Sequence, residues 1–365
     1  MNYKVAKISP LNTPVFRLSL HGTDYEIGRQ RGIILAEDLH HMWDWMEAHM
    51  ASAYKLPRDK WAFAAKKASE CFSFSVPWLL EQIEGMHDGS QLDMEKLLLM
   101  NNYGVIWTNN GNWCSSVAIR YSDEGGLVGQ NLDLGAEDFY YMEETHPSSA
   151  CAILSGAMTA ICSYPCGINN HGLAVASSNL PAPGQRLQPW EWQGLPYLFL
   201  PFVVLRQCRK VKEAIDYIKS LPPSIPSGGG YQLNLMDSSG DMAVIDRSGH
   251  RTIVRQCDAN LNFTTNCSLS SEMESWRLGS EGENSDAMLR VERIRKEWAK
   301  LQGAVPTRTW LKELLAEDKE SGALCRTNER GFTRQSFIFS PGKLTMDIAN
   351  GPPNRNEYKL CKFRD

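Results

Sequence analysis

The sequence has no uninterrupted apolar stretch near the length of about 18 residues that spans a bilayer, although 42% of its 365 residues are hydrophobic. Its first 20 residues contain lysines but no continuous apolar core of the kind that a secretion signal has. Both absences speak against entry into a membrane or passage across one. We therefore expect a soluble, cytoplasmic protein.

Long basic runs are missing as well. The formal net charge is −4, and lysines and arginines are scattered along the whole chain. This distribution does not provide the concentrated positive surface that binds nucleic acid or anionic lipid. We expect neither nucleic acid nor a membrane as partner and predict a small-molecule substrate.

The sequence also lacks a recognisable metal-binding pattern. Cys162 and Cys166 flank three residues, but no second pair of Cys or His residues completes a tetrahedral set. The three histidines in LHHMWDWMEAHM (39–50) do not form an HExxH motif. We expect no bound metal. Ten cysteines without a secretion signal favour reduced thiols, most of them small buried hydrophobic residues.

The chain divides into a helical part and a mixed part. Apolar residues at three- and four-residue steps predict helices over about 25–50, 59–73, 77–86 and 92–101. From Cys114 onward, short β-type runs alternate with glycine-containing turns. The expected strands lie within 114–121, 126–134, 150–155, 157–164, 173–180, 231–246 and 336–348, and the expected later helices within 197–218 and 285–317.

Turns and loops complete this pattern. GINNHG (167–172) predicts a turn between neighbouring strands, and DSSGD (237–241) suits a hairpin. The polar stretches 181–194 and 268–285 are typical of loops that frame a binding site. The order of elements predicts an α+β layered fold in one domain.

Cys114 stands at the junction of the two parts, after the turn-forming residues NNGN (109–112). A thiol nucleophile needs a base, and no histidine lies in a sequence context that is typical of a catalytic base. Cleavage of the bond before Cys114 would free an α-amino group with a pKa of about 7.7–8.0 on the same residue as the thiol. The alternative interpretation is a buried strand cysteine with no chemical role.

The segments around Cys114 resemble a known family. GQNLDL (129–134), GINNHGLAVASSNL (167–180) and TTNCSL (264–269) follow it in order, HGTDYEIGRQRG (21–32) precedes it, and RKVKEAIDYI (209–218) and ALCRTNERGFTRQSFIFSP (323–341) also match. This set resembles N-terminal nucleophile hydrolases of the penicillin acyltransferase type, the acyl-CoA:6-aminopenicillanic acid acyltransferases, which are related to bile salt and penicillin V hydrolases. The matches span roughly residues 21–350.

The resemblance implies a four-layer αββα sandwich and an enzyme that cleaves or transfers the acyl group of a small N-acyl compound, with no cofactor. Cys114 would be the nucleophile after self-cleavage between Trp113 and Cys114, and its own amine would be the base. Segment 1–113 would be a helical α segment retained on the β segment 114–365, the two forming one domain, and association of whole molecules into a homo-oligomer stays open.

The same resemblance gives roles to four further residues. Asp133 would hold the new amine, Asn179 and Asn266 would donate hydrogen bonds to the oxyanion, and Arg326 would place a positive charge near the thiol. Each also has a structural interpretation: a turn aspartate, strand-end caps and a surface arginine. Gln130 stands where the acyltransferase branch has glutamine and the bile salt branch arginine.

Two departures from the family pattern bear on these roles. Trp113 occupies the position before the cysteine, where the acyltransferase branch usually has glycine, so self-cleavage could be slower. The late motif reads CRTNE (325–329) and lacks the usual histidine.

Aromatic residues are the candidates for the substrate pocket. Phe139 and Tyr140 in one segment and Trp190 and Trp192 in another could receive an apolar acyl group, or could simply cover the core. Two other functions stay open: a non-catalytic binding protein of the same fold, and a histidine-assisted cysteine hydrolase that needs no cleavage.

Overall fold

A short strand and five helices make up the first hundred residues of the computed structural model, which describes residues 16–50, 56–102, 114–134, 140–158, 162–180, 195, 197–221, 230–248, 251–256, 258–276, 281–319, 321–328 and 331–364. The elements are β1 (Arg17–Gly22), α1 (Asp24–Ile34), α2 (Ala36–Met50), α3 (Trp61–Ser75), α4 (Pro77–Ser90) and α5 (Met94–Asn101). The helices agree with the prediction, with one correction. The helix expected over 25–50 is two helices, because Leu35 leaves the helical conformation at φ −103° and ψ 17°.

The strands of the described residues form two sheets. The eight-stranded sheet A has the order β1, β4 (Tyr140–Pro147), β5 (Ile153–Met158), β6 (Gly167–Asn169), β7 (Ala174–Leu180), β8 (Gly230–Met236), β9 (Met242–Ser248) and β10 (Arg251–Arg255). The seven-stranded sheet B has the order β11 (Leu261–Thr264), β2 (Ser115–Ser122), β3 (Gly125–Leu134), β13 (Gly331–Ser340), β14 (Thr345–Ala349) and β15 (Lys359–Lys362), with β12 (Thr327–Asn328) on β13. All pairings are antiparallel except that of β1 with β4.

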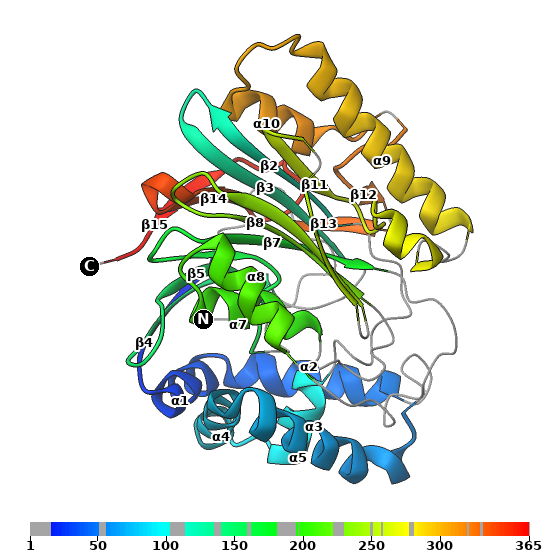
Figure 1. Ribbon diagram of the computed structural model, residues 1–365. Coiled ribbons are helices and arrows are strands. Elements are labelled where there is room, and N and C mark those ends of the chain that lie inside the picture. Colours follow the sequence, from blue (N-terminus) through cyan, green and yellow to red (C-terminus); the bar gives the residue numbers. More distant parts are fainter. Residues whose placement is uncertain are drawn as a thin grey trace.

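Helices cover the outer faces of both sheets (Figure 1). The first five helices, with α7 (Leu200–Gln207) and α8 (Val211–Ser220), lie on the side of sheet A, while α9 (Glu281–Lys300) and α10 (Arg308–Ala316) lie on sheet B. The predicted four-layer αββα sandwich is therefore confirmed.

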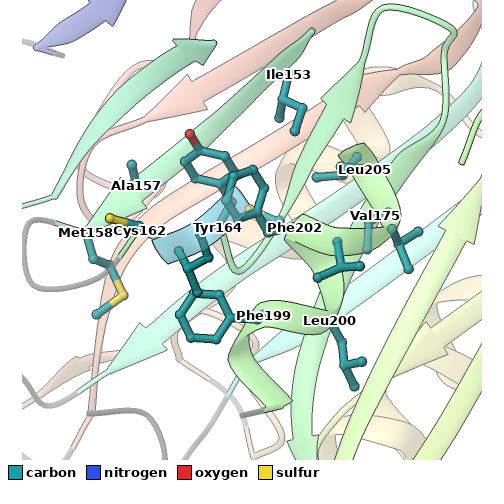
Figure 2. Packing of buried hydrophobic residues seen from close by; sticks show 14 of the residues in the cluster. Ile153, Ala157, Met158, Cys162, Tyr164, Val175, Phe199, Leu200, Phe202 and Leu205 are labelled. Carbon is teal, nitrogen blue, oxygen red and sulfur yellow. The ribbon is translucent and has the colours of Figure 1, made fainter. Parts of the chain in front are cut away.

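Strand β2 shows how the sequence alternation builds these layers. Val117 and Ile119 pack with apolar residues of α9 and α10 in one buried cluster, whereas Ala118 between them belongs to the other cluster, on the face toward sheet A. Successive side chains of a strand point to opposite faces, so one strand contributes to both cores. On the far side of sheet A, the rings of Tyr164 and Phe202 meet edge to face at 4.4 Å (Figure 2).

Several expected elements differ in detail. The helix predicted over 197–218 is α7 and α8, separated at Cys208, which adopts an extended conformation. Strand β5 covers parts of the two strands expected over 150–155 and 157–164, and residues 162–164 do not belong to a strand. Strands β1, β4, β10, β11 and β15 were not predicted, although Leu18 and Leu20 of β1 alternate with polar residues. Because β1 adds an edge strand to sheet A, the segment 1–113 is not purely helical.

Helices α1 and α4 approach each other unusually closely through glycines. Gly28 and Gly32 of α1 face Gly85 and Gly89 of α4, and a Cβ built on Gly85 would lie 2.1 Å from the carbonyl oxygen of Tyr25. Only residues without a side chain allow this backbone contact. This close contact holds α1 against α4. Because β1 directly precedes α1, the contact also helps to position the edge strand of sheet A.

Candidate active site

Five candidate residues meet where strands of the two sheets end. Cys114 directly precedes β2, Asp133 lies near the end of β3, and Asn179 near the end of β7. Asn266 follows β11, and Arg326 directly precedes β12. A continuous set of hydrogen bonds links all five, as the following contacts describe. The sequence therefore marked residues that the fold does bring together, while their chemical roles remain predictions.

The Cys114 side chain is buried, with an exposed fraction of 5%. Its Sγ lies 3.6 Å from the backbone carbonyl oxygen of Asp133, to which the thiol donates. Burial, followed by the nearby Asp133 carboxylate, raises the pKa of this thiol to about 12. In the uncleaved chain the cysteine is thus held in its protonated form.

Asp133 is fully buried, and only one of its two carboxylate oxygens has a hydrogen-bond partner among the described residues. Its Oδ1 accepts a 2.6 Å hydrogen bond from the Thr333 hydroxyl, whereas its Oδ2 has no hydrogen-bond partner among the described residues. Burial raises the pKa of this carboxyl to about 7, although Thr333 and two arginines act in the opposite direction. An unpaired buried acceptor costs free energy. Its position near Cys114 suits a donor that the uncleaved chain does not supply.

Thr333 reaches Asp133 at an irregularity of the sheet. The pairing of β3 with β13 shifts register between Thr333 and Gln335, which marks a β-bulge or similar irregularity. Such irregularities re-aim side chains and are frequent near functional sites. The Thr333 hydroxyl also accepts a 2.9 Å hydrogen bond from the backbone N–H of Arg326.

Asn266 joins the two sheets in a backbone conformation that few residues adopt. Its φ is +67°, in the left-handed region that asparagine tolerates better than most side chains. Its Nδ2 donates to the carbonyl oxygen of Asn179 at 2.9 Å. An amide nitrogen carries two hydrogens, so this bond uses one of them.

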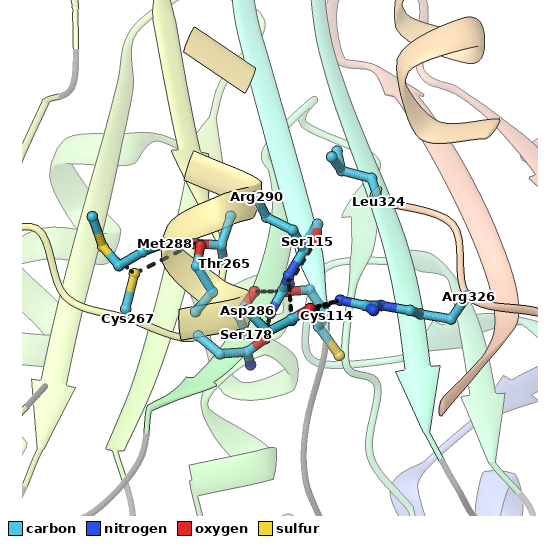
Figure 3. Close-up of polar contacts among 12 residues, drawn as sticks. Cys114, Ser115, Ser178, Thr265, Cys267, Asp286, Met288, Arg290, Leu324 and Arg326 are labelled. Carbon is cyan, nitrogen blue, oxygen red and sulfur yellow. Dashed lines mark hydrogen bonds and ion pairs between the residues drawn. The ribbon is translucent and has the colours of Figure 1, made fainter. Parts of the chain in front are cut away.

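Arg326 points toward the cysteine from the segment before β12 (Figure 3). Its Nη2 donates to both carboxylate oxygens of Asp286 on α9, each at 2.6 Å. Its Nε has no hydrogen-bond partner among the described residues. The side chain is therefore anchored at one end, and its charge acts on the pKa of Asp133.

Asp286 and Arg290 of α9 were missed by the sequence analysis. Arg290 is buried and donates to the carbonyl oxygen of Cys114 at 2.8 Å and to Oδ1 of Asn266 at 3.1 Å (Figure 3). The only signal in the sequence is the i, i+4 spacing of an acid and a base within a predicted helix. That spacing is equally typical of a solvated surface pair.

The remaining candidates have different surroundings. Gln130 is fully buried, and its side-chain amide bonds both the N–H and the carbonyl oxygen of Ser177, each at 2.8 Å, so that it ties β3 to β7. Tyr140 is buried with an exposed fraction of 7%. The other four predicted positions, Trp113, Phe139, Trp190 and Trp192, lie outside the described residues. Cleavage after Trp113 and substrate contact by the other five remain predictions.

Within the described ranges, no three His, Cys, Asp or Glu side chains gather in a way that could hold a metal ion. None of the helices in that part of the chain is long and apolar enough to cross a bilayer.

Solved structures with a similar fold were found at low identity. A mutant of the conjugated bile acid hydrolase from Clostridium perfringens is 14% identical, covers 69% of this chain and 97% of its own, and has a TM-score of 0.42. Penicillin V acylase from Agrobacterium tumefaciens is 13% identical over 65% of this chain and 83% of its own, with a TM-score of 0.40. The Caenorhabditis elegans ortholog of N-acylethanolamine-hydrolyzing acid amidase is 13% identical over 69% of this chain and 100% of its own, with a TM-score of 0.43.

No curated protein matches the chain by sequence. The family model of acyl-coenzyme A:6-aminopenicillanic acid acyl-transferase matches residues 122–355. This range contains Asp133, Asn179, Asn266 and Arg326, and it begins after Cys114. Because the match covers more than half of the sequence, the chain belongs to the acyl-coenzyme A:6-aminopenicillanic acid acyl-transferase family.

Proposed function

We propose that this protein activates itself by cleavage before Cys114 and then cleaves or transfers the acyl group of a small N-acyl compound through a Cys114 thioester. Membership of an acyl-transferase family supports the reaction class, acyl transfer at an amide. The observation that carries the proposal is the buried Oδ2 of Asp133, which lacks a partner in the described residues of the uncleaved chain. A new α-amine on Cys114 would supply that partner.

Self-cleavage would proceed by an N-to-S acyl shift. The Cys114 thiol attacks the carbonyl carbon of the preceding residue, the C–S bond forms as the C–N bond breaks, and the thiol proton passes to the leaving nitrogen. Water then hydrolyses the resulting ester of the thiol and leaves a carboxyl end on the first segment. Cys114 keeps its thiol and gains a free α-amine.

The cleaved form would have a base beside its nucleophile. The amine takes the thiol proton as sulfur attacks the substrate carbonyl, and it returns the proton to the departing amine. Asn266 Nδ2, which gives one hydrogen to Asn179, would donate the other to the developing oxyanion, a contribution typically worth roughly a hundredfold in rate. Water or a second amine then accepts the acyl group. Asp133 would hold the amine in place.

The first segment would stay attached after cleavage. Strand β1 pairs in parallel with β4, and Arg31 of α1 forms a buried ion pair with Glu143 of β4. A second buried pair joins Asp24 of α1 to Arg206 of α7. Contacts on this scale do not depend on the peptide bond before Cys114.

The two rival functions have less support. Among the described residues, His40 and His87 contact backbone carbonyls in the helical layer and His146 contacts Glu144, and none of these contacts reaches Cys114. An uncleaved binding protein would have no evident need for the unpaired carboxylate of Asp133, whose burial costs free energy.

Intact mass and N-terminal sequence of the purified protein test the proposal. We expect two fragments from the parent, the larger beginning at Cys114, and one uncut chain from Cys114→Ala. Cys208→Ala is the matched control, because it removes another buried cysteine, at the end of α7, and should be cut like the parent. A single chain in the parent after prolonged incubation would contradict self-activation.

Activity is tested separately with chromogenic amides that differ only in the acyl group. Release of the amine by the cleaved parent, and not by Cys114→Ala, would support the reaction class. Turnover by a form that keeps the bond before Cys114 intact would point to the histidine-assisted mechanism.

A further inference from the structure

We propose that Arg290 of α9 is a positioning residue of this site, which fixes Cys114 and Asn266 in one geometry. The inference rests on the proposed function, because it assigns Arg290 to the same nucleophile and the same oxyanion donor. The sequence marks Arg290 only by its i, i+4 spacing from Asp286, and its hydrogen bonds to Cys114 and Asn266 go to the backbone carbonyl oxygen and to Oδ1. Its effect is exerted through the groups that it holds.

The guanidinium of Arg290 binds four oxygens at once. Its Nη1 donates to the carbonyl oxygen of Cys114 at 2.8 Å and to Oγ of Ser115 at 2.9 Å, and its Nη2 donates to Oδ1 of Asn266 at 3.1 Å. Its Nε donates to Oδ2 of Asp286 at 3.1 Å. With a side chain only 1% exposed, the group is closed off from solvent. A planar guanidinium matches such a fixed arrangement, which an ammonium cannot reproduce.

A rigid element presents this group to the site. The residues Ala287, Val291 and Ile294 of α9 are buried in the cluster that packs the helix on sheet B. Asp286 lies one turn before Arg290 and binds it, while its carboxylate also holds Arg326. One acidic side chain therefore sets the positions of two arginines near Cys114.

The bond to Cys114 survives the proposed cleavage. The carbonyl oxygen that Arg290 binds lies on the C-terminal side of the bond that would be cut. The new terminus would therefore stay tethered by Arg290 and by the pairing of Ser115 with Asn131 in β3. Without Arg290, the carbonyl oxygen of Cys114 would lose its 2.8 Å hydrogen bond and keep the longer one, 3.4 Å, from Oγ of Ser178.

Arg290 also orients the oxyanion donor. Its bond to Oδ1 of Asn266 fixes the plane of that amide, and this directs Nδ2 toward the carbonyl oxygen of Asn179.

The positive charge of Arg290 is a second way in which this residue acts on Cys114. Two guanidinium groups, Arg290 and Arg326, share the single carboxylate of Asp286. Burial and Asp133 raise the pKa of the Cys114 thiol, and the charge of Arg290 acts against both. Loss of that charge makes the thiolate harder to form.

The rate at which iodoacetamide labels Cys114 between pH 6 and pH 10 tests this proposal, with labelling followed on the Cys114 peptide by mass spectrometry. We expect Arg290→Gln to slow labelling at pH 8 by about tenfold, as one pKa unit would produce. Arg290→Lys keeps the charge and should lie between Gln and the parent. Arg293→Gln is the matched control: Arg293 is a buried arginine of the same helix that pairs with Glu317 instead.

The pH profile separates positioning from general packing. A profile of Arg290→Gln identical to that of the parent would overturn the proposal, as would equal slowing in Arg293→Gln at an equal fall in Tm. Should Arg290→Gln not fold, Arg290→Lys decides the question by the same comparison. If the parent is never cut, the proposed function fails, yet this assay still applies, because Arg290 makes its contacts in the uncut chain.

Discussion

Replacement of Asp133 by asparagine should change how stability depends on pH. In the uncleaved chain, burial raises the pKa of this carboxyl from an ordinary 3.8 to about 7. The folded protein thus binds a proton that the unfolded chain releases, and stability falls as pH rises from about 4 to about 7. A difference of roughly three pKa units corresponds to about 4 kcal/mol, of which about 3 kcal/mol is lost between pH 5 and pH 8.

Asparagine does not titrate, so the variant does not lose this stability as the pH rises. Its oxygen can still accept the Thr333 hydroxyl, while its NH₂ replaces the unpaired Oδ2 at a cost of about 1–3 kcal/mol. We expect the variant to be less stable than its parent by about 1–3 kcal/mol near pH 5, and similar to it or more stable by up to about 2 kcal/mol at pH 8. Cleavage and activity should be lost together with the acceptor for the amine.

Urea unfolding at several pH values measures this difference. A Cys114→Ala background keeps the chain uncut, so Cys114→Ala is compared with the Cys114→Ala/Asp133→Asn double variant, and equal m-values ensure that the same surface is exposed. If both proteins lose the same stability between pH 5 and pH 8, the Asp133 carboxyl does not titrate as its burial requires. The reasoning about an acceptor reserved for the new amine would then be wrong.

Three further predictions concern stability and are measured by urea unfolding. Gly85→Ala should cost about 1–3 kcal/mol, because its Cβ would overlap the carbonyl oxygen of Tyr25 and force α1 and α4 apart; an unchanged midpoint would contradict the close contact. Arg31→Met should cost about 3–5 kcal/mol by leaving the Glu143 carboxylate buried without its cation, and a loss below 1 kcal/mol would be inconsistent with that pair. Thr307→Ala removes the cap of α10 and should cost about 1 kcal/mol, whereas Thr307→Ser should retain most of it.

Local patterns anticipated most elements of the fold. The 3.6-residue periodicity located the helices of the first hundred residues, and the turn DSSGD correctly predicted the hairpin between β8 and β9, where Asp237 Oδ1 binds the N–H of Ser239. Strand β1 was missed although its residues alternate between buried and less buried positions. It is short and has no hairpin partner next to it in the sequence, because it pairs in parallel with β4, more than 100 residues later.

For the site, the sequence determined which groups lie on neighbouring strand ends. Cys114 and Asp133 are joined by a short antiparallel hairpin, so their proximity follows from local pairing. The resemblance added Asn179, Asn266 and Arg326 by the order of their motifs. These residues carry recognisable neighbours in the sequence, and the fold places them within one connected set of contacts.

Only the tertiary structure decided the electrostatics of that site. The spacing of Asp286 and Arg290 describes a helical pair, but whether such a pair is solvated or buried against a nucleophile depends on the packing of α9 on sheet B. Likewise, no pattern in the sequence shows that one oxygen of Asp133 lacks a donor. Burial and the presence of partners are set by residues distant in the chain, and these, more than residue type, fix the free energy of a charged group.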